Sequence, residues 1–336
     1  MRKKKFFIIA EAGVNHNGSL KKALRLINIA ANAGANAVKF QTFKAENLVT
    51  THASKAEYQK NLILKKETQF QMLKKLELSH KMHLACIAEC KKKKIIFISS
   101  AFDIESLLYL KKLKLNYFKV PSGEITNFPY LEVLGKFKKK IILSTGMSNI
   151  NEIEKAIKAL VKHGTDKKNI TLMQCTSAYP APYEEINLNT IQALRNKFKL
   201  NIGFSDHSLG IQASITAAAL GATIIEKHLT LDNNLKGPDH KASLDPTEFK
   251  SMVRSIRIVE KVLGDKIKKP TKSEKKNISV VRKSIVALKN IRKEDKFSKL
   301  NICCKRPGTG VSPLFFSKFL GKKSNRNYKK DDFIKY

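Results

Sequence analysis

The chain of 336 residues lacks any apolar run of the roughly 18 residues that a membrane-spanning helix needs. Its first residues, MRKKKFFIIAEAG, combine a basic start with an apolar stretch, as a signal peptide does. The apolar stretch ends at Glu11 after about five residues, whereas the apolar region of a signal peptide has roughly 7–15. We therefore expect a cytoplasmic protein.

Cysteine is also scarce. The five cysteines are odd in number, and their spacing forms no disulfide framework. Cys86 and Cys90 lie four residues apart in a helical pattern, and the neighbours Cys303 and Cys304 cannot easily pair in a relaxed chain. Because disulfides persist mainly in oxidising compartments, we expect reduced thiols, in agreement with a cytoplasmic location.

Acidic residues are few: 28 Asp and Glu stand against 65 Lys and Arg, which gives a formal net charge of +37. Such a charge raises the alternative of a nucleic-acid-binding protein. However, nine of the basic residues are arginine, and the charge is spread over the whole chain, with short runs at 91–94 and 136–140. We attribute the excess to a general lysine bias and expect no nucleic-acid partner, although a positive field steers anionic substrates towards the protein.

What the sequence does contain is a regular alternation of apolar β-rich segments and amphipathic helical patterns, such as 20–34, 151–164 and 247–264. This alternation is typical of parallel strands joined by helices, with both faces of the sheet covered. The expected strands are 6–13, 37–43, 95–102, 117–124, 141–147, 170–177, 201–208 and 223–230. Eight regular units favour an α/β fold of the (β/α)8 TIM-barrel type over the alternative, a doubly wound open sheet.

The composition changes after the last helical pattern. Residues 265–280 are rich in lysine, contain Pro270 and lack apolar periodicity, so we expect a linker there. Residues 281–336 have a different texture and form a small module, whose size suggests that it needs support from the barrel to fold. The predicted organisation is a barrel domain over 1–264, a linker and a C-terminal module.

Barrel enzymes carry their active sites at the carboxyl ends of the strands, and these ends are unusually polar here. The seventh expected strand ends near His207 and the eighth near His228. Neighbouring strands bring the two imidazoles within reach of one metal ion, and Glu11 on the first strand can add an oxygen directly or through water. Such ligands suit a borderline divalent ion such as Mn²⁺, Fe²⁺ or Zn²⁺.

Two further ionisable residues, Glu226 and Lys227, precede His228. The alternation of side chains along a strand puts Glu226 and His228 on one face and Lys227 on the other. The roles of Glu226 and Lys227 stay open at this level.

Lys39 on the second strand and Lys119 on the fourth predict an anion site, with serine and threonine hydroxyls between them. Lysine supplies charge and hydroxyls supply directed donors, a combination that suits a phosphate and a carboxylate. Inward charges that are only structural need matching partners. The strand-end side chains are mainly cationic, so an anionic ligand is the simpler expectation.

The chain resembles the sialic acid synthases, which make nine-carbon sugar acids. The matching stretches cover nearly the whole chain in the family's order: AEAGVNHNGSL, AVKFQTFKAENL, KVPSGEITNFPYLE, ILSTGMSNINEIE, CTSAYPAPYEEINL, GFSDHSLG, IEKHLTLD, GPDHKASLDP and KRPGTGVSP. The resemblance implies a barrel followed by a small antifreeze-like (SAF) domain, and a domain-swapped homodimer in which that domain caps the partner's barrel. It implies that phosphoenolpyruvate condenses with an N-acetylated amino sugar and releases phosphate.

The resemblance also implies residue roles. His207 and His228 would hold a divalent metal, usually Mn²⁺, and Glu124 would lie beside the reacting carbons. The implied catalytic groups are Glu11, Glu124, His207 and His228. The implied phosphoenolpyruvate-binding residues are Lys39, Ser100, Lys119, Ser122, Ser144, Ser177 and Ser205. The implied sugar-binding residues are Gln41, Tyr179, Asp239 and Arg306, the last reaching from the small module into the partner's site.

The chain departs from the family's pattern at Ala101, where proline is expected, and at Ser177, where some members have asparagine. Neither change removes a charge or a ligand, so we expect activity. N-acetylmannosamine is the first expectation for the sugar, which would make the chain an N-acetylneuraminate synthase. The alternative is 2,4-diacetamido-2,4,6-trideoxymannose, the substrate of legionaminate synthases, and a pseudaminate synthase fits the motifs less well.

Overall fold

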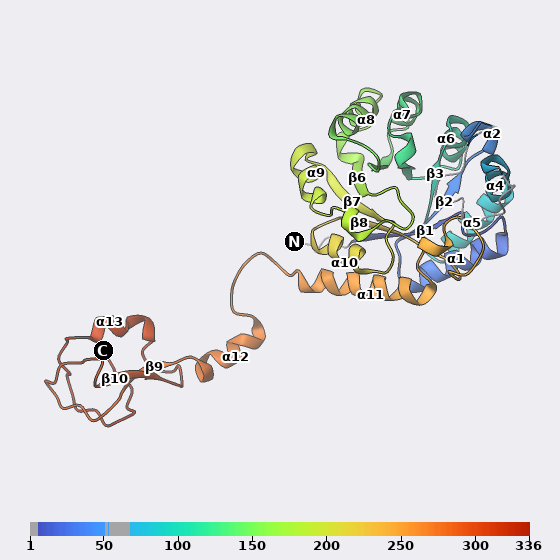
Figure 1. Ribbon diagram of the computed structural model, residues 1–336. Helices are drawn as coiled ribbons and strands as arrows, with labels where there is room; N and C mark the ends of the chain where they lie inside the picture. The colour runs from blue at the N-terminus through green and yellow to red at the C-terminus, as the bar shows by residue number, and fades with distance from the viewer. Residues whose placement is uncertain (1–5, 51–52, 54–67) are drawn as a thin grey trace. The chain divides into compact units, whose positions relative to one another are not determined.

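The structure is a computed structural model that describes residues 6–50, 53 and 68–336. The chain divides into two compact units, Met1–Gly264 and Asp265–Tyr336, shown in Figure 1. The first unit carries the predicted strands and the polar strand ends, and the second contains the small module.

The first unit is a closed barrel of parallel strands in which each strand pairs with the next and β8 pairs with β1. The strands are β1 Phe7–Gly13, β2 Ala37–Thr42, β3 Ile96–Ala101, β4 Tyr117–Val120, β5 Lys140–Ser144, β6 Ile170–Cys175, β7 Asn201–Asp206 and β8 Ile224–His228. Each strand overlaps its expected range, so the predicted (β/α)8 barrel is confirmed. The register brings Glu11 opposite His228 and Ser205 opposite Glu226.

Helices surround this barrel (Figure 1). They are α1 Leu20–Ala33, α2 Ala45–Leu48, α4 Gln69–Leu76, α5 His80–Lys92, α6 Ile104–Lys112, α7 Phe128–Gly135, α8 Ile150–Lys162, α9 Thr190–Phe198, α10 Gln212–Ala219 and α11 Pro246–Val262. Polar side chains cap the N-termini of several of these helices. Asn149 caps α8 and Asp245 caps α11, each in a capping box with the glutamate three residues later in the chain. The apolar faces of these helices form the main core against the outside of the barrel.

A second apolar cluster fills the inside of the barrel below the polar strand ends. It consists of Ile9, Ala37, Ile98, Ile142, Met173 and Ile224. Phe7 and Tyr117 pack against it, with their rings stacked at a centroid distance of 5.5 Å. Because this layer is packed with apolar side chains, polar chemistry is confined to the carboxyl end of the barrel.

The second unit has its own apolar core, which includes Ile285, Ile291, Phe297 and Tyr328. Its elements are α12 Lys272–Val281, the antiparallel strands β9 Ser284–Ala287 and β10 Ile302–Lys305, and α13 Phe316–Phe319.

Helix α12 occupies more than half of the segment 265–280, whose role as a linker stays a prediction. Thr271 caps this helix in a capping box with Glu274, which compensates for the missing apolar periodicity.

All five cysteines are free. Across the described ranges, no helix combines the length and the apolar composition that crossing a membrane requires.

Candidate active site

A cavity of about 410 Å³ opens at the carboxyl ends of the barrel strands. Most of the site residues that the sequence predicts line this cavity. They come from all eight barrel strands or from the loops that follow them. They are Glu11, Lys39, Gln41, Ser100, Lys119, Ser122, Ser144, Ser177, Tyr179, Ser205, His207, His228 and Asp239.

Two of the predicted residues do not line this cavity. Glu124 is half-buried, and its Oε2 accepts a hydrogen bond from Asn127 Nδ2 at 2.7 Å. Burial raises the pKa of Glu124. Arg306 belongs to the second unit, directly after β10, and its role stays a prediction.

His207 is held by its neighbours in one orientation. Its Nδ1 lies 2.6 Å from the carbonyl oxygen of Thr176, which can only accept a hydrogen bond. Nδ1 therefore carries the proton, and Nε2 presents a lone pair on the cavity side, 3.3 Å from both Tyr179 Oη and Ser205 Oγ. The ring of Tyr179 stacks on that of His207 at 4.2 Å and stiffens the arrangement.

His228 lies beside it, with the ring centroids 5.6 Å apart. Its buried Nδ1 has no hydrogen-bond partner among the residues that the structure describes, and it lies 3.7 Å from Asp239 Oδ2. Burial lowers the pKa of His207 to about 4 and that of His228 well below its usual value, so both rings are neutral at pH 7. Neutral imidazoles are the form that binds a divalent metal.

The two histidines thus fit a metal ion, with an unsatisfied buried nitrogen on one and a backbone hydrogen bond orienting the other. In the part of the chain that the structure describes, no group of three or more His, Cys, Asp or Glu side chains forms a metal site. A site with two imidazole ligands leaves coordination positions open to a substrate. Glu11, which could supply an oxygen directly or through water, is ion-paired with Lys39 at 2.7 Å, and its part in metal binding stays a prediction.

The floor of the cavity is a buried network of two lysines and two glutamates. Lys119 Nζ lies 2.7 Å from Glu226 Oε1, and Lys39 Nζ lies 3.8 Å from Glu226 Oε2. Ser205 Oγ donates to Glu226 Oε1 at 2.9 Å. Lys39 Nζ also donates to Ser100 Oγ at 3.0 Å.

The two glutamates of this network differ in the direction in which their pKa values are shifted. Burial raises the pKa of Glu11 to about 7, even though Lys39 acts in the opposite direction. Burial also disfavours the charged form of Glu226, but Lys119 and Lys39 hold its pKa well below the usual range. Near neutral pH the floor therefore contains, beside its lysines, one firmly ionised carboxylate and one carboxylate that readily takes up a proton.

The inward lysines have carboxylate partners in Glu226 and Glu11, and the anionic ligand expected at this site stays a prediction. Glu226 has no role that the sequence alone assigns, although its position two residues before His228 on one strand face is a usable signal. Glu226 and His228 both line the cavity and Lys227 does not, as the strand alternation predicts.

Hydroxyl groups complete the floor on the side of β4, β5 and β6. The backbone N–H of Gly146 donates to Ser122 Oγ at 3.1 Å. A Cβ added at Gly146 would lie 2.3 Å from Ser177 Oγ and 2.7 Å from Ser122 Oγ, so glycine lets these hydroxyls converge. Serine hydroxyls and a backbone N–H so close together can donate to the oxygens of one anion.

Behind the cavity, a second buried ion pair joins β7 and β8. Lys227 Nζ lies 3.0 Å from Asp206 Oδ2 and donates to the carbonyl oxygen of Ser208 at 2.5 Å. Asp206 also accepts from the hydroxyls of Ser208 and Ser214, each at 2.6 Å. This pair is on the outer strand face, next in sequence to the two histidines that face the cavity.

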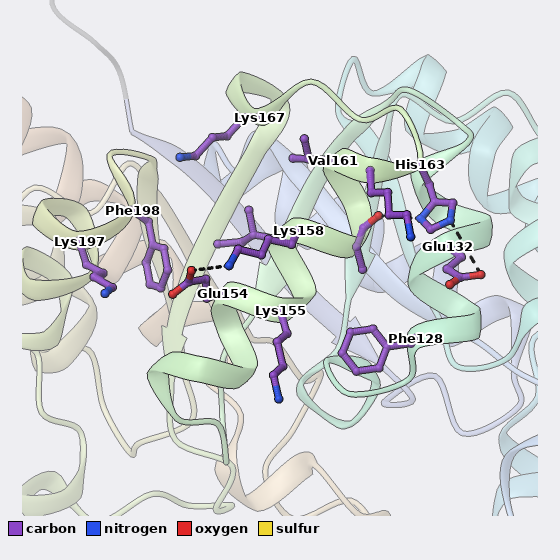
Figure 2. A pocket seen from close by; sticks show the side chains of 13 residues that line it. Phe128, Glu132, Glu154, Lys155, Lys158, Val161, His163, Lys167, Lys197 and Phe198 are labelled. Atoms are coloured by element: carbon purple, nitrogen blue, oxygen red, sulfur yellow. Dashed lines mark hydrogen bonds and ion pairs between the residues drawn. The ribbon is translucent and has the colours of Figure 1, made fainter.

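A larger hollow of about 880 Å³ lies in the helical layer among α7, α8 and α9. Figure 2 shows its charged groups pairing across the surface, Lys158 with Glu154 at 2.8 Å and His163 with Glu132 at 3.9 Å. These side chains are mostly exposed helix residues. The strand-end cavity, with its buried charges, is therefore the candidate active site.

The fold and this cavity define a (β/α)8-barrel enzyme in which a cationic, hydroxyl-rich floor adjoins a pair of imidazoles suited to a metal. The chain matches the NeuB family over residues 26–268. It is 54% identical to the N,N'-diacetyllegionaminic acid synthase of Campylobacter jejuni, covering 99% of both chains. It is 44% identical to the synthase of that name from Legionella pneumophila, covering 96% of this chain and 91% of that one.

Among solved structures, it resembles the N-acetylneuraminic acid synthetase of Leptospira borgpetersenii in complex with citrate. The TM-score is 0.73 and the identity 36%, over 82% of this chain and 91% of that one. The chain belongs to the NeuB family and is a phosphoenolpyruvate-dependent synthase of nonulosonic acids.

Proposed function

We propose that the chain condenses phosphoenolpyruvate with 2,4-diacetamido-2,4,6-trideoxymannose to give N,N'-diacetyllegionaminic acid and phosphate. The observation that carries the reaction type is the cavity itself, in which the anion floor and the imidazole pair are adjacent. The relatives at 54% and 44% identity support the sugar. They favour legionaminate, the alternative at the level of sequence, over N-acetylneuraminate, which the sequence placed first.

In this proposal the floor binds phosphoenolpyruvate. Lys39 and Lys119 supply positive charge, and serine hydroxyls donate to the phosphate and carboxylate oxygens. Glu11, with its pKa raised to about 7, can take up a proton and so reduce repulsion towards the incoming anion. The hydroxyl donors are Ser100, Ser122, Ser144, Ser177 and Ser205.

His207 and His228 would hold a divalent metal, which we propose to be Mn²⁺ and which, when bound, polarises the aldehyde of the open-chain sugar. Tyr179, Gln41 and Asp239 surround that position and would orient the sugar hydroxyls. Carbon 3 of phosphoenolpyruvate then forms a bond to the sugar's carbonyl carbon. Water adds at carbon 2, and phosphate leaves by cleavage of its bond to that carbon. The family resemblance would have Glu124 relay protons beside these carbons, although its side chain lies outside the cavity lining and is hydrogen-bonded to Asn127.

For Asp265–Tyr336 we propose the role that the family resemblance implies. This unit would be an antifreeze-like domain that caps the barrel of a second copy in a homodimer, with Arg306 contacting the N-acetyl group there. Its separate apolar core supports an independent module. The cytoplasm is the proposed location, as expected from the free cysteines.

The test offers purified protein phosphoenolpyruvate, Mn²⁺ and an equal mixture of the diacetamido sugar and N-acetylmannosamine. We expect phosphate release with N,N'-diacetyllegionaminic acid as the main product by mass spectrometry. His228→Ala should abolish phosphate release, because it removes one of two imidazoles. His80→Ala, which changes an exposed histidine outside the cavity, serves as the matched control. A main product of N-acetylneuraminate, or near-normal turnover by His228→Ala, contradicts this proposal.

A further inference from the structure

One side of the cavity differs from the polar floor. Its lining side chains are apolar and come from α2, α4 and the residues after β2 and β3. We call this set the apolar wall, and it consists of Leu48, Val49, Met72, Leu73 and Phe102. None of these side chains can donate a hydrogen bond or supply a strong acceptor.

The wall is part of a packed cluster rather than a loose loop surface. Leu48, Leu73 and Phe102 pack against buried residues that include Phe43 and Met72. Figure 1 shows α2 and α4 beside each other on the side of the barrel that carries β2 and β3. The cluster holds Leu48, Met72, Leu73 and Phe102 in place before a substrate arrives, and Val49 directly follows Leu48 in the chain.

Polar contacts fasten the outer side of the two helices. Lys74 Nζ lies 2.6 Å from Glu46 Oε1 and 3.2 Å from Glu77 Oε1. Glu77 Oε1 also accepts from the backbone N–H of Ala45 at 3.0 Å. Exposed ion pairs stabilise little individually, but together these contacts set the position of α4 against α2 and therefore the position of Leu73.

The location of the wall fixes which part of a sugar can reach it. In the proposed reaction, C1 of the open-chain sugar lies at His207 and His228, next to the floor. The wall begins beyond the last residues of β2 and β3, further from the floor. The end of the sugar opposite C1 is therefore the part that meets the wall.

Towards that end the candidate sugars differ at C4, an acetamido group against a hydroxyl, and at C6, a methyl in the 6-deoxy sugar against a hydroxymethyl in N-acetylmannosamine. A methyl group gains free energy when apolar side chains bury it. A hydroxyl that is buried against such side chains loses its hydrogen bonds to water and finds no replacement. The cavity lining beside the wall also contains a polar side chain, Gln69, one turn before Leu73. Because a polar group of the sugar could contact it, the choice at C6 has to be tested separately from the choice at C4.

We propose that the apolar wall binds the C6 methyl group of the sugar and makes the enzyme selective for 6-deoxy substrates. This inference rests on the proposed function, because it takes the position of C1 from the proposed reaction. It assigns the choice at C6 to α2 and α4.

The test uses a matched pair of sugars, N-acetylmannosamine and its 6-deoxy analogue, which are identical at every other carbon. The measurement is kcat/KM for phosphate release with saturating phosphoenolpyruvate and Mn²⁺. The wild type should favour the 6-deoxy sugar by roughly tenfold or more, the range expected when one small group meets an apolar pocket. Leu73→Asn and the near-isosteric Val49→Thr should each reduce this preference by about threefold to tenfold. Neither should change the KM for phosphoenolpyruvate.

Leu108→Asn is the control, because it makes the same kind of change on α6 at an exposed position outside the cavity. It should keep the wild-type preference. The inference is overturned if both wall variants keep that preference, or if they lose activity equally with both sugars. If the wild type fails to use the diacetamido sugar, the proposed function is lost, whereas the C6 preference is still measured on a pair that lacks the second acetamido group.

Discussion

Glu226 is the acceptor at which the two cationic side chains of the active site converge. It lies within 2.7 Å of Lys119 and 3.8 Å of Lys39, and its side chain is almost fully buried. A carboxylate in this position neutralises part of the lysine charge until an anion binds. Such a group couples the stability of the barrel to the occupancy of the floor.

Glu226→Gln is therefore expected to destabilise the barrel by about 3 kcal/mol, because it leaves Lys119 buried without a charged partner. Binding of phosphoenolpyruvate should then restore charge balance, so that a saturating concentration raises the melting temperature of this variant more than that of the wild type. Thermal denaturation with and without the ligand measures both effects. Equal ligand-induced shifts in the two proteins would contradict the role given to Glu226.

At this scale the sequence predicts which side chains reach the cavity better than it predicts their partners. Strand alternation and the position of strand ends identify Lys39, Lys119, His207 and His228. Pairing of Lys119 with Glu226 joins side chains 107 residues apart across the barrel. That contact depends on the closure of the sheet, which no local pattern specifies.

The strands β7 and β8 position the two histidines of the cavity: His207 directly follows β7, and His228 ends β8. Asp206 and Lys227 are register partners on these strands and form a buried ion pair on the outer face. Their positions next to His207 and His228 mean that a shift between the strands would move the two imidazoles relative to each other. We infer that this pair sets the spacing of the histidines.

Asp206→Asn should destabilise the protein by about 3 kcal/mol or more, since it breaks a buried pair and leaves Lys227 unneutralised. Asp206→Asn combined with Lys227→Met should recover part of this loss, because no buried charge then stays unpaired. Urea denaturation of Asp206→Asn, Lys227→Met and the double variant gives the coupling. Glu154→Gln, which breaks the exposed pair with Lys158, should change stability far less than Asp206→Asn does. A double variant that is as unstable as the sum of the single changes would refute the coupling.

Element boundaries follow the sequence where a cap or an apolar stripe marks them, as at Asn149 and Asp245. Helix α12 was missed because its lysine-rich segment has no apolar stripe, although Thr271 and Glu274 form a capping box. The apolar wall was also missed. Its residues come from two short helices after β2 and one position after β3, and only the tertiary packing gathers them.

On the scale of the whole molecule, burial of neutral histidines links folding to pH. His83 is a buried residue of α5. Its Nε2 lies 2.8 Å from Thr42 Oγ1 and its Nδ1 lies 3.0 Å from the carbonyl oxygen of Ser79. Burial lowers the pKa of His83 to about 4. In the unfolded chain the pKa is close to its usual value of about 6.5.

Between these two pKa values the unfolded state binds a proton that the folded state does not, so His83 makes stability fall as the pH drops from about 6.5 towards 4. The loss from this residue is expected to be on the order of 1–2 kcal/mol at pH 5. Urea denaturation at pH 7 and pH 5 should show a smaller difference for His83→Gln than for the wild type. An unchanged difference would show that His83 does not stay neutral in the folded protein.

The burial of three lysines separates the chemistry of the protein from its charge. Lys39 and Lys119 are each 4% exposed, and Lys227 is fully enclosed, whereas the positive charge of +37 comes mainly from lysines on the outside. Amine-directed acylation can therefore remove much of the surface charge while these three buried side chains keep their carboxylate partners. Such labelling can alter the solubility of the enzyme and its adhesion to polyanions without modifying the buried lysines of the active site.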